Sequence, residues 1–380
     1  MKRYGKRKKV ADTIIVVAGG TSGHIYPALA IASELKRLHP LTRLVFCGVE
    51  KGLEQKLVQA EGFEFRPIAA QNMPSKHDCR YVSWVTQNIR GIFLSDAILE
   101  EERPRLVIGT GGFVSAPLLA AAKWRGVPYI IHEQNSVPGR ANRMFARKAE
   151  TVFLSYDASR QYFPDKSSLI MSGNPVRKIF YEIDRQSARE ALNIEDDLFL
   201  VLLMGGSLGA RTLNNAVAHI DDEGKWSALL EKHPTARLSI STGVQSDKSL
   251  ADELAKIPGV VKAEHFFHDA PYWIAACDFF VGRAGAMTCA EIAAQAKPSM
   301  LIPYPFAADD HQTENARAMQ EAGASIICAD SDFDSQTLLD TISQMIQQPE
   351  VLAEMGESAG RWATPQAARV IAESVPKVVK

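Results

Sequence analysis

Two segments of this 380-residue chain repeat one arrangement: a continuous apolar run, a glycine-rich turn and a helical pattern. The first reads TIIVVAGGTSGHIYPALA from Thr13, and the second reads LFLVLLMGGSLGARTLNNAV from Leu198. Apolar runs without polar alternation are typical of strands that are covered on both faces, as in a parallel sheet. Each segment therefore predicts the opening strand, loop and helix of its own doubly wound α/β domain.

Short runs rich in Val, Ile, Leu and Phe continue through both halves and alternate with helical patterns. The alternation pauses over the charged stretch YEIDRQSAREALNIEDD at 181–197, so we place the boundary between two α/β domains near residues 175–195. We expect the remaining strands within residues 43–48, 63–68, 105–110, 128–133, 151–156, 168–173, 236–242, 260–267, 278–283, 298–304 and 324–329.

The composition is that of a soluble globular protein with a sizeable core, with 46% hydrophobic and 23% charged residues. The net charge of -1 gives no reason to expect a nucleic-acid partner. No stretch is long and apolar enough to span a bilayer. The five cysteines are scattered and mostly lie in apolar runs, which favours reduced core residues over disulfides or a metal site.

Six basic residues crowd the N-terminus. Such an arm either lies on anionic lipid or acts as a solubilising tail. The apolar run after it does not predict a signal peptide, because Asp12 interrupts it and no small-residue cleavage site follows. The basic residues are Lys2, Arg3, Lys6, Arg7, Lys8 and Lys9.

Three glycine turns follow predicted strands: AGGTSGH at 18–24, GTGGFVSAP at 109–117 and MGGSLGAR at 204–211. Glycine allows left-handed dihedrals and close backbone approach, and the helix beyond offers free N–H groups to a phosphate. The carboxyl ends of parallel strands are where open α/β sheets bind ligands. None of the turns has Walker or G-x-G-x-x-G spacing, so a nicotinamide-dependent oxidoreductase is not favoured.

Two polar patterns in the second half suit recognition of a sugar nucleotide. Glu291 lies early in a helix expected over 288–296, where it either accepts from sugar hydroxyls or favours a first helical turn. His311, Gln312 and Asn315 share one helix face, which suits hydroxyl or amide recognition, and Asp309 or Asp310 would cap that helix.

The sequence DSD at 330–332 looks like the metal-binding Asp-x-Asp of GT-A glycosyltransferases. It lies between the last strand and the helix SQTLLDTISQMI, so we interpret it as a helix cap. We therefore expect no metal.

Five motifs in this chain, taken together, resemble the MurG family. These enzymes transfer N-acetylglucosamine from UDP to the undecaprenyl-pyrophosphoryl-muramyl-pentapeptide lipid of peptidoglycan synthesis. The resemblance runs from about residue 13 to about residue 325 in the family's order. The motifs are GGTSGHIYPALA, HEQN at 132–135, GNPVR at 173–177, GGSLGAR at 205–211 and GAMTCAEIAA at 285–294.

The resemblance implies a GT-B fold, with two Rossmann-like domains facing a cleft, and an inverting reaction that forms a β-1,4 linkage without a cofactor. It implies the following division: an arm at 1–12, an acceptor- and membrane-facing domain at 13–175, a UDP-sugar domain at 176–362 and a helix at 363–380 that packs back on the first domain.

The resemblance also assigns residues to UDP-N-acetylglucosamine. An arginine and helix N-termini would stabilise the charge of the leaving UDP. The matching positions are Arg177 and Ser207 at the diphosphate, Phe267 beside uracil, Ala286, Met287, Thr288 and Glu291 from phosphate to ribose, His311, Gln312 and Asn315 at the sugar hydroxyls, and Thr21, Ser22, Gly23 and Asn135 reaching the donor sugar from the first domain.

Inversion requires a base for the C4 hydroxyl of the muramyl sugar. His24 matches the family's candidate base, and the alternative is a structural or phosphate-binding role. Glu133 is a second candidate, and the alternative is that it braces its loop. The acceptor pyrophosphate is expected at Gly19, Gly20, Gly111, Gly112 and Phe113, with Phe113 where a tyrosine is frequent in the family and Ser22 where glycine is common.

The helical segment from Tyr81 to Leu99 carries an apolar stripe beside Arg80 and Arg90. Such a stripe is either a core face or a membrane face. The resemblance implies peripheral attachment to the cytoplasmic face of the inner membrane through this region. The stripe consists of Val82, Val85, Ile89, Ile92 and Phe93.

Three alternatives remain open. Another lipid-acceptor transferase of this fold, such as a glycosyldiacylglycerol synthase, is disfavoured by HEQN and GNPVR. A UDP-N-acetylglucosamine 2-epimerase shares the fold and nucleotide but needs no acceptor loop or membrane face. A sugar-nucleotide-binding module without catalysis is disfavoured by the set His24, Arg177 and Glu291.

Overall fold

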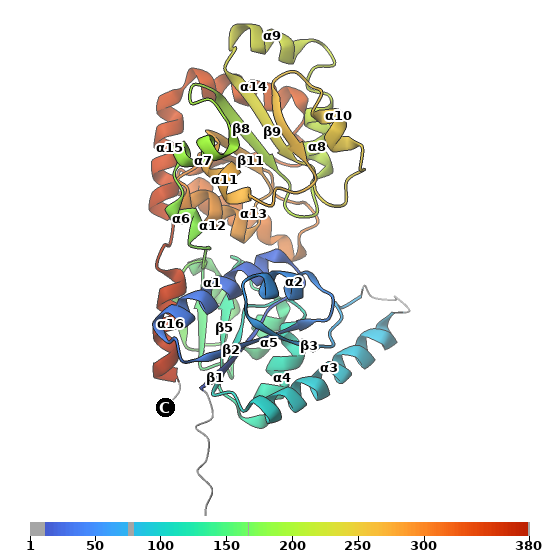
Figure 1. Cartoon of the computed structure of the whole chain (residues 1–380), viewed down its shortest axis with the longest axis vertical. Helices are drawn as coiled ribbons and strands as arrows, with labels where there is room; N and C mark the ends of the chain where they lie inside the picture. The colour runs from blue at the N-terminus through green and yellow to red at the C-terminus, as the bar shows by residue number, and fades with distance from the viewer. Residues whose placement is uncertain (1–11, 75–79, 166, 379–380) are drawn as a thin grey trace, which may run out of the picture. The chain divides into compact units, whose positions relative to one another are not determined.

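A computed structural model describes residues 12–74, 80–165 and 167–378, so the basic residues Lys2 to Lys9 lie outside the described residues. The chain divides into two compact units (Figure 1). Unit 1 runs to Arg177 and includes the chain from Gln366 onwards, whereas unit 2 consists of Lys178–Pro365.

Unit 1 is built on a seven-stranded parallel sheet with the order β3-β2-β1-β4-β5-β6-β7. The strands are β1 Thr13–Val17, β2 Arg43–Val49, β3 Glu64–Ile68, β4 Leu106–Gly109, β5 Tyr129–Glu133, β6 Thr151–Leu154 and β7 Leu169–Met171. The helices are α1 Ser22–Leu38, α2 Leu53–Ala60, α3 Tyr81–Glu102, α4 Ser115–Arg125, α5 Arg140–Ala146 and α16 Ala367–Val378, with a 3₁₀ turn at Asp157–Tyr162.

Unit 2 is built on a six-stranded parallel sheet with the order β10-β9-β8-β11-β12-β13. The strands are β8 Phe199–Met204, β9 Ala236–Ser241, β10 Val260–Glu264, β11 Phe279–Gly282, β12 Ser299–Leu301 and β13 Ser325–Ile327. The helices are α6 Ile179–Glu182, α7 Arg185–Leu192, α8 Arg211–Ala218, α9 Lys225–Lys232, α10 Leu250–Leu254, α11 Ala270–Ala276, α12 Ala286–Ala294, α13 His311–Glu321, α14 Ser335–Gln347 and α15 Pro349–Trp362, with a 3₁₀ turn at Ala308–Asp310.

Strand β1 shows why these strands read as unbroken apolar runs. Ile15 and Val17 point into a core that includes residues of α3 and α4. Ile14 and Val16 point into a second core on the opposite face, with residues of α1 and α16. Both faces of β1 are therefore shielded from water. The bounds of every strand fall inside the predicted range or extend beyond it by one residue at most. The prediction of two doubly wound α/β domains is confirmed.

Each sheet has one place where the strand order reverses. In unit 1 it lies between β1 and β4, and in unit 2 between β8 and β11. Loops that leave two such neighbouring strands diverge to opposite faces and open a crevice at the carboxyl end of the sheet, where α/β domains bind ligands. The glycine turns at 18–24 and 109–117 flank the reversal in unit 1, and those at 204–211 and 282–286 flank it in unit 2.

The aspartates at 330–332 do not cap α14, contrary to expectation. The cap is Asp334, whose side chain accepts a hydrogen bond of 2.8 Å from the backbone N–H of Thr337. Asp330 instead pairs with Arg283, with 2.5 Å between the charged atoms. The described residues bring together no group of three or more His, Cys, Asp or Glu side chains suited to hold a metal ion. Within the described part of the chain, no helix combines the length and apolar character needed to cross a membrane.

The last helix, α16, belongs to unit 1 and packs beside α1 (Figure 1). Ile371, Ala372 and Val375 are fully buried in the core that α1 shares with the sheet. The end of the chain thus completes one covering layer of the first sheet.

Replacing Ile371 with Ala should therefore destabilise unit 1 by roughly 2–5 kcal/mol, because a buried side chain is lost and a cavity remains. Urea unfolding measures this change. The control is Glu373→Ala on the same helix, whose exposed ion pair with Arg369 is worth less than about 1 kcal/mol. Equal effects of the two substitutions would show that α16 is not part of the core.

Candidate active site

The two glycine loops of unit 1 are in direct backbone contact. A Cβ atom added at Gly112 would lie 2.2 Å from the carbonyl oxygen of Gly19, and the φ angle of Gly112 is +77°. Both the space and the dihedral require glycine there. The ring of Phe113 lies over Gly20, where an added Cβ would be 2.8 Å from a ring carbon. The loops predicted to receive a pyrophosphate thus form one surface.

His24 lies in the first turn of α1, half-buried against the second glycine loop. An added Cβ at Gly111 or Gly112 would come within 3.2 Å or 3.0 Å of the imidazole. Nδ1 is 3.1 Å from the carbonyl oxygen of Thr110 and 2.9 Å from Oε1 of Gln134. No side chain or backbone group of the described residues hydrogen-bonds Nε2. The imidazole is therefore held through Nδ1 alone.

Glu133 is buried and its carboxylate is already occupied. One oxygen accepts from the backbone N–H and the side-chain amide of Asn135, at 2.9 and 3.2 Å. The other accepts from the N–H of Gly139 and the amide of Asn142, at 3.0 and 2.8 Å. Since only 1% of Glu133 is exposed, it braces the loop from 135 to 142, and the arrangement does not favour it as an acid or base. Asn135 is half-buried on that loop.

The motifs HEQN and GNPVR form one hydrogen-bonded network. Nε2 of His132 donates to the carbonyl oxygen of Gly173 at 3.1 Å. The amide of Asn174 donates to the carbonyl oxygen of Gln134 at 3.0 Å. His132 is fully buried, and burial lowers its pKa to about 4. His132 is therefore neutral at physiological pH.

The structure places Arg177 in unit 1, whereas the sequence division puts it at the start of the second domain. Its guanidinium stacks on the ring of Tyr26 in α1, with 4.2 Å to the ring centre. This cation–π contact orients the guanidinium toward the same end of α1 that carries His24.

The first glycine loop of unit 2 packs against the loop after β9. An added Cβ at Gly209 would lie 2.1 Å from the carbonyl oxygen of Thr242. Across this contact, the N–H of Val244 donates to the carbonyl oxygen of Ser207 at 3.1 Å. In the described residues the Ser207 hydroxyl has no hydrogen-bond partner, which suits a phosphate ligand.

The second ligand-facing segment of unit 2 is α12 with the turn before it. Ala286 and Met287 are buried in its first turn, and Thr288 is half-buried. Glu291 is half-buried and lies in the second turn, so the first-turn interpretation of its charge was wrong. The buried side chain of Asn315 donates to the carbonyl oxygen of Ala284 at 3.2 Å, so it braces this turn from α13 and is closed to a sugar.

Two other residues at the start of α13 also bind backbone. Oε1 of Gln312 accepts from the N–H of Tyr304 at 3.0 Å, and in the described chain its amide nitrogen has no partner. Nδ1 of His311 lies 2.7 Å from the carbonyl oxygen of Ala308. Gln312 is thus a fixed hydrogen-bond donor beside the loop from 303 to 310.

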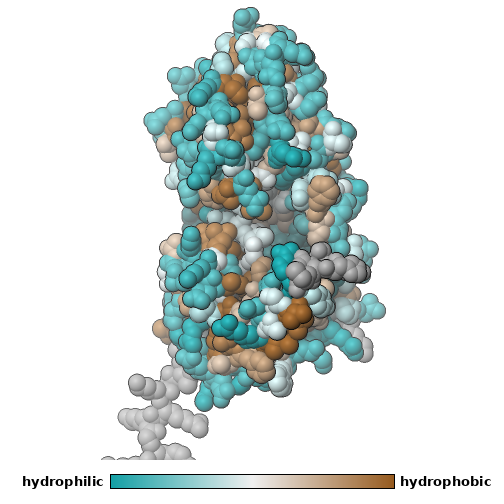
Figure 2. Space-filling view, turned by 90° about the vertical axis from the view of Figure 1, so that its right-hand side faces the viewer, coloured by the Kyte–Doolittle hydropathy of each residue, from teal (hydrophilic) through white to brown (hydrophobic). Residues whose placement is uncertain are grey.

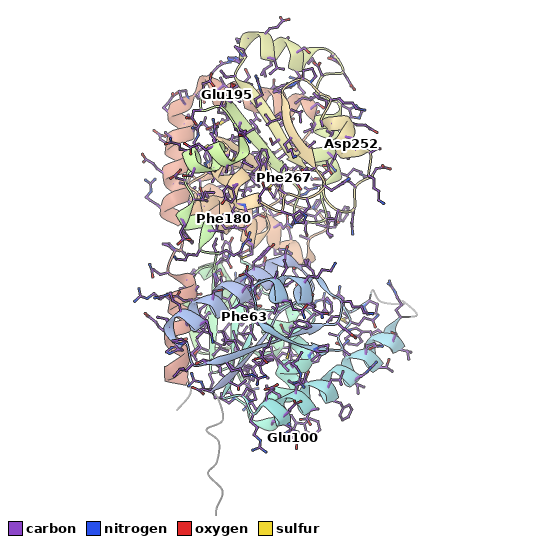
Figure 3. The ribbon with its side chains drawn as sticks, viewed as in Figure 1. Phe63, Glu100, Phe180, Glu195, Asp252 and Phe267 are labelled. Carbon is purple, nitrogen blue, oxygen red and sulfur yellow. The ribbon has the colours of Figure 1, made fainter. Side chains whose placement is uncertain are left out.

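Phe267 cannot lie against a base, contrary to expectation. Phe267 lies within unit 2 (Figure 3) and is 1% exposed. Its ring stacks on that of Trp273, with 4.7 Å between ring centres. The adjacent Phe266 is half-exposed and meets His268 edge-on. Both phenylalanines lie in the loop that follows β10 Val260–Glu264, where no regular period applies, so sequence alone did not decide which one is accessible.

Arg283 was missing from the predicted site. Its guanidinium follows β11 at the reversal of the second sheet, pairs with Asp330 and donates to the carbonyl oxygens of Ile302 and Pro303 at 3.2 and 3.3 Å. It also lies over the ring of Tyr304, at 5.5 Å from its centre. A charged residue directly after a buried strand was the available signal.

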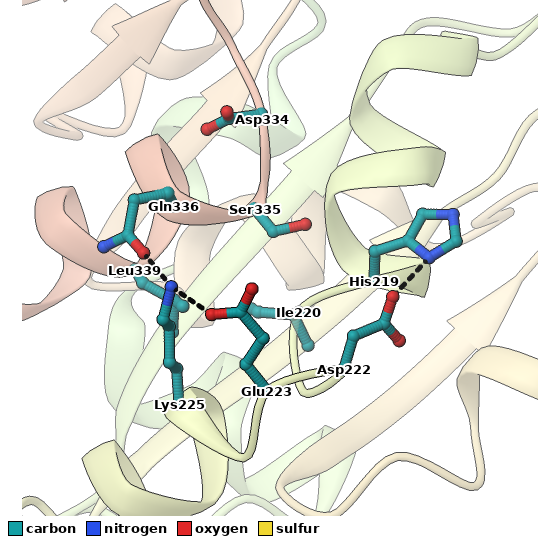
Figure 4. Close-up of a pocket in the computed structure, with 9 residues that line it drawn as sticks. All are labelled: His219, Ile220, Asp222, Glu223, Lys225, Asp334, Ser335, Gln336 and Leu339. Carbon is teal, nitrogen blue, oxygen red and sulfur yellow. Dashed lines mark hydrogen bonds and ion pairs between the residues drawn. The ribbon is translucent and has the colours of Figure 1, made fainter.

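A separate pocket of about 240 Å³ lies among α8, α9 and α14 (Figure 4). Of its ionisable side chains, His219 pairs with Asp222 and Lys225 with Glu223, whereas Asp334 caps α14. None of the predicted site residues lines it.

Comparisons with known proteins match both halves of the chain to one glycosyltransferase family. Residues 14–154 match the glycosyltransferase family 28 N-terminal domain, and residues 200–374 match the family 28 C-terminal domain. The chain is 36% identical over 371 residues to the UDP-N-acetylglucosamine–N-acetylmuramyl-(pentapeptide) pyrophosphoryl-undecaprenol N-acetylglucosamine transferase of Desulforudis audaxviator (strain MP104C), covering 96% of this chain and 98% of the relative.

Two solved structures share the fold. The crystal structure of Acinetobacter baumannii MurG superposes with a TM-score of 0.72 at 25% identity, over 96% of this chain and 99% of that one. The UDP-GlcNAc 2-epimerase of Neisseria meningitidis, bound to UDP-GlcNAc, gives a TM-score of 0.67 at 17% identity, over 96% of this chain and 100% of that one. At 17% identity, the similarity to the epimerase shows a shared fold and nothing about the reaction.

The buried neutral His132 predicts a pH-dependent stability. Its pKa is about 4 in the folded chain and near 6.5 when exposed, so the unfolded state binds the extra proton between these values. Stability is therefore lost as the pH falls from about 6.5 to about 4, by up to ~1.4 kcal/mol per pH unit. Urea unfolding of wild type and His132→Gln across this range should show the extra slope in wild type only; parallel curves would contradict it.

Proposed function

This chain belongs to glycosyltransferase family 28 and, within it, to the MurG transferases, and from that premise we propose how its residues carry out the reaction. The chain is a hexosyltransferase that moves N-acetylglucosamine from UDP-GlcNAc to the undecaprenyl-pyrophosphoryl-MurNAc-pentapeptide lipid (lipid I) and so forms lipid II for peptidoglycan synthesis.

The observation that carries the mechanism is the unpartnered Nε2 of His24, held against the glycine loops of unit 1. The muramyl C4 hydroxyl gives its proton to Nε2 while its oxygen bonds to the anomeric carbon of the donor sugar. The bond from that carbon to the diphosphate oxygen breaks, and UDP leaves with the electron pair. One displacement of this kind inverts the anomeric centre and gives a β-1,4 linkage.

The acceptor's pyrophosphate binds the surface formed by the loops Gly19–Gly20 and Gly111–Phe113. Their glycines let backbone N–H groups approach an anion, and the N-terminus of α1 adds partial positive charge. Phe113 contributes its ring edge over Gly20 and no hydroxyl. Thr21, Ser22, Gly23 and Asn135 bind the donor sugar.

Unit 2 binds the nucleotide. Ser207 and the first turn of α12, with Ala286, Met287 and Thr288, hold the diphosphate. Glu291 accepts from the ribose hydroxyls, and Phe266 takes the place beside uracil that the buried Phe267 cannot occupy. Gln312 donates to a sugar hydroxyl, with His311 alongside and Asn315 bracing from behind.

Transfer can be tested with labelled UDP-N-acetylglucosamine and a short-chain analogue of the muramyl lipid. We expect sugar to pass to the acceptor, and His24→Ala to lower kcat roughly 100- to 10,000-fold with donor affinity unchanged, because only proton transfer is lost. His219→Ala, an exposed histidine of unit 2, is the control. Epimerisation of the donor without transfer would overturn the function, and an equal loss of donor binding would remove the role of His24 as the base.

We also propose that unit 1 attaches to the cytoplasmic surface of the membrane through one face of α3. Figure 2 looks onto the side of unit 1 that carries α3 and shows hydrophobic surface there. Tyr81, Val82, Ile89, Phe93 and Leu94 are between 38% and 72% exposed. Of the predicted stripe, Val85 is half-buried and Ile92 packs on the core, so these two do not contribute.

Replacing Ile89 or Phe93 with Glu should weaken binding to phosphatidylglycerol vesicles at least about tenfold, since an apolar side chain no longer enters the lipid and a like charge is added. Vesicle co-sedimentation measures the change. Val261→Glu, a partly exposed apolar position in unit 2, is the control and should bind as wild type does. Unchanged binding of both α3 variants would exclude this face.

A further inference from the structure

The side chain of Gln134 lies between two histidines. Its Oε1 is 2.9 Å from Nδ1 of His24, and its Nε2 is 2.8 Å from Nδ1 of His132. Gln134 is 1% exposed, so its amide has no access to water. The polar atoms of this amide must therefore find their hydrogen-bond partners among the protein groups around them, because water cannot reach them.

Two backbone carbonyls fix which way the amide points. Nε2 of Gln134 carries two hydrogen atoms. One is donated to the carbonyl oxygen of Thr110 at 2.9 Å, and the other is shared by Nδ1 and the carbonyl oxygen of His132, at 2.8 and 3.2 Å. If the amide were flipped, its oxygen would face the carbonyl oxygens of Thr110 and His132. All three oxygens are acceptors, so no hydrogen bond could form among them. The amide oxygen must therefore face His24.

This orientation determines where the proton of His24 is. Nδ1 faces two acceptors, the Thr110 carbonyl and the Gln134 amide oxygen, and neither can donate to it. Nδ1 must carry the hydrogen atom, and in the neutral imidazole Nε2 then carries a lone pair. His132 has the opposite tautomer, because its Nδ1 accepts from Gln134 and its Nε2 donates to Gly173.

We propose that Gln134 is a positioning residue that, with the Thr110 carbonyl, holds His24 as its Nδ1–H tautomer and so presents the Nε2 lone pair to the incoming hydroxyl. The catalytic part of this proposal rests on the function proposed above. The other tautomer carries a hydrogen atom on Nε2 and cannot take the proton. Once Nε2 is protonated, the same two oxygens face the Nδ1–H of the imidazolium and stabilise its charge.

The tautomers can be read directly from ¹⁵N-histidine-labelled protein without any substrate. Long-range ¹H–¹⁵N correlation spectra distinguish a protonated from an unprotonated ring nitrogen. At a pH where histidines are neutral, His24 should show a protonated Nδ1 and His132 a protonated Nε2. Spectra of His24→Ala and His132→Gln assign the two rings. A protonated Nε2 on His24 in wild type would overturn the proposal, whatever reaction the chain catalyses.

The role of Gln134 itself is tested with Gln134→Met, which keeps the length of the side chain and removes its hydrogen bonds. The His24 spectrum should shift toward the Nε2–H tautomer, and kcat should fall about tenfold, the worth of one neutral hydrogen bond, at unchanged KM for UDP-N-acetylglucosamine.

The matched control is Tyr129→Phe in β5, which loses a buried hydrogen bond of 2.9 Å to the Phe145 carbonyl but does not touch His24. It should keep both the tautomer and kcat. Equal effects of the two variants, or a Gln134→Met protein with the wild-type tautomer and kcat, would show that Gln134 serves stability alone. If Gln134→Met does not fold, the wild-type spectrum still decides the tautomer.

Discussion

The carbonyl oxygen of Thr110 accepts hydrogen bonds from the ring of His24 and from the amide of Gln134. The Thr110 hydroxyl in turn donates to the carbonyl oxygen of His24 at 2.8 Å. Strands β1, β4 and β5 are neighbours in the first sheet, so the segments that follow them begin side by side. The segments after β1 and β5 both contact Thr110, which follows β4. The glycines at 111 and 112 permit the contact, because a side chain at either would push the imidazole away. The geometry of the proposed base thus depends on a parallel sheet that brings three loops together.

Unit 2 also has a parallel sheet with one reversal of strand order, but a different side chain links the loops at its carboxyl end. There the guanidinium of Arg283 joins the turn after β11 to the backbone after β12 and to Asp330 beyond β13. The side chains of Gln312 and Asn315 add two further links from α13 to these loops. Loops that carry no regular hydrogen bonds of their own are in this way fixed by side chains from neighbouring elements. A ligand that binds there finds donors whose positions are already set, which lowers the entropic cost of binding.

The fold could be predicted from the sequence because burial on both faces of a strand is recorded in unbroken apolar runs, such as that from Thr13 to Val17. The glycine loops could also be predicted, since the requirement at Gly112 is local to the backbone. Which side chains reach a ligand depends on packing between elements distant in sequence. Phe267 and Asn315 are of types that could bind a base or a sugar, but both are buried. The carboxylate of Glu133 already accepts four hydrogen bonds from its own loop and from Asn142. Arg283 is marked in the sequence only by its charge directly after a buried strand, and Gln134 acquires its role from partners that no local pattern reveals.

The central claim is that a single imidazole activates the acceptor hydroxyl for one direct displacement at the anomeric carbon. The stereochemistry of the product tests this claim most directly, since one displacement inverts the centre and two restore it. Proton NMR of the disaccharide made from the α-linked donor reports the configuration through the coupling of the anomeric hydrogen. The account predicts that all of the product carries the β linkage. An α-linked product would contradict it, because retention excludes a one-step displacement with His24 as the base.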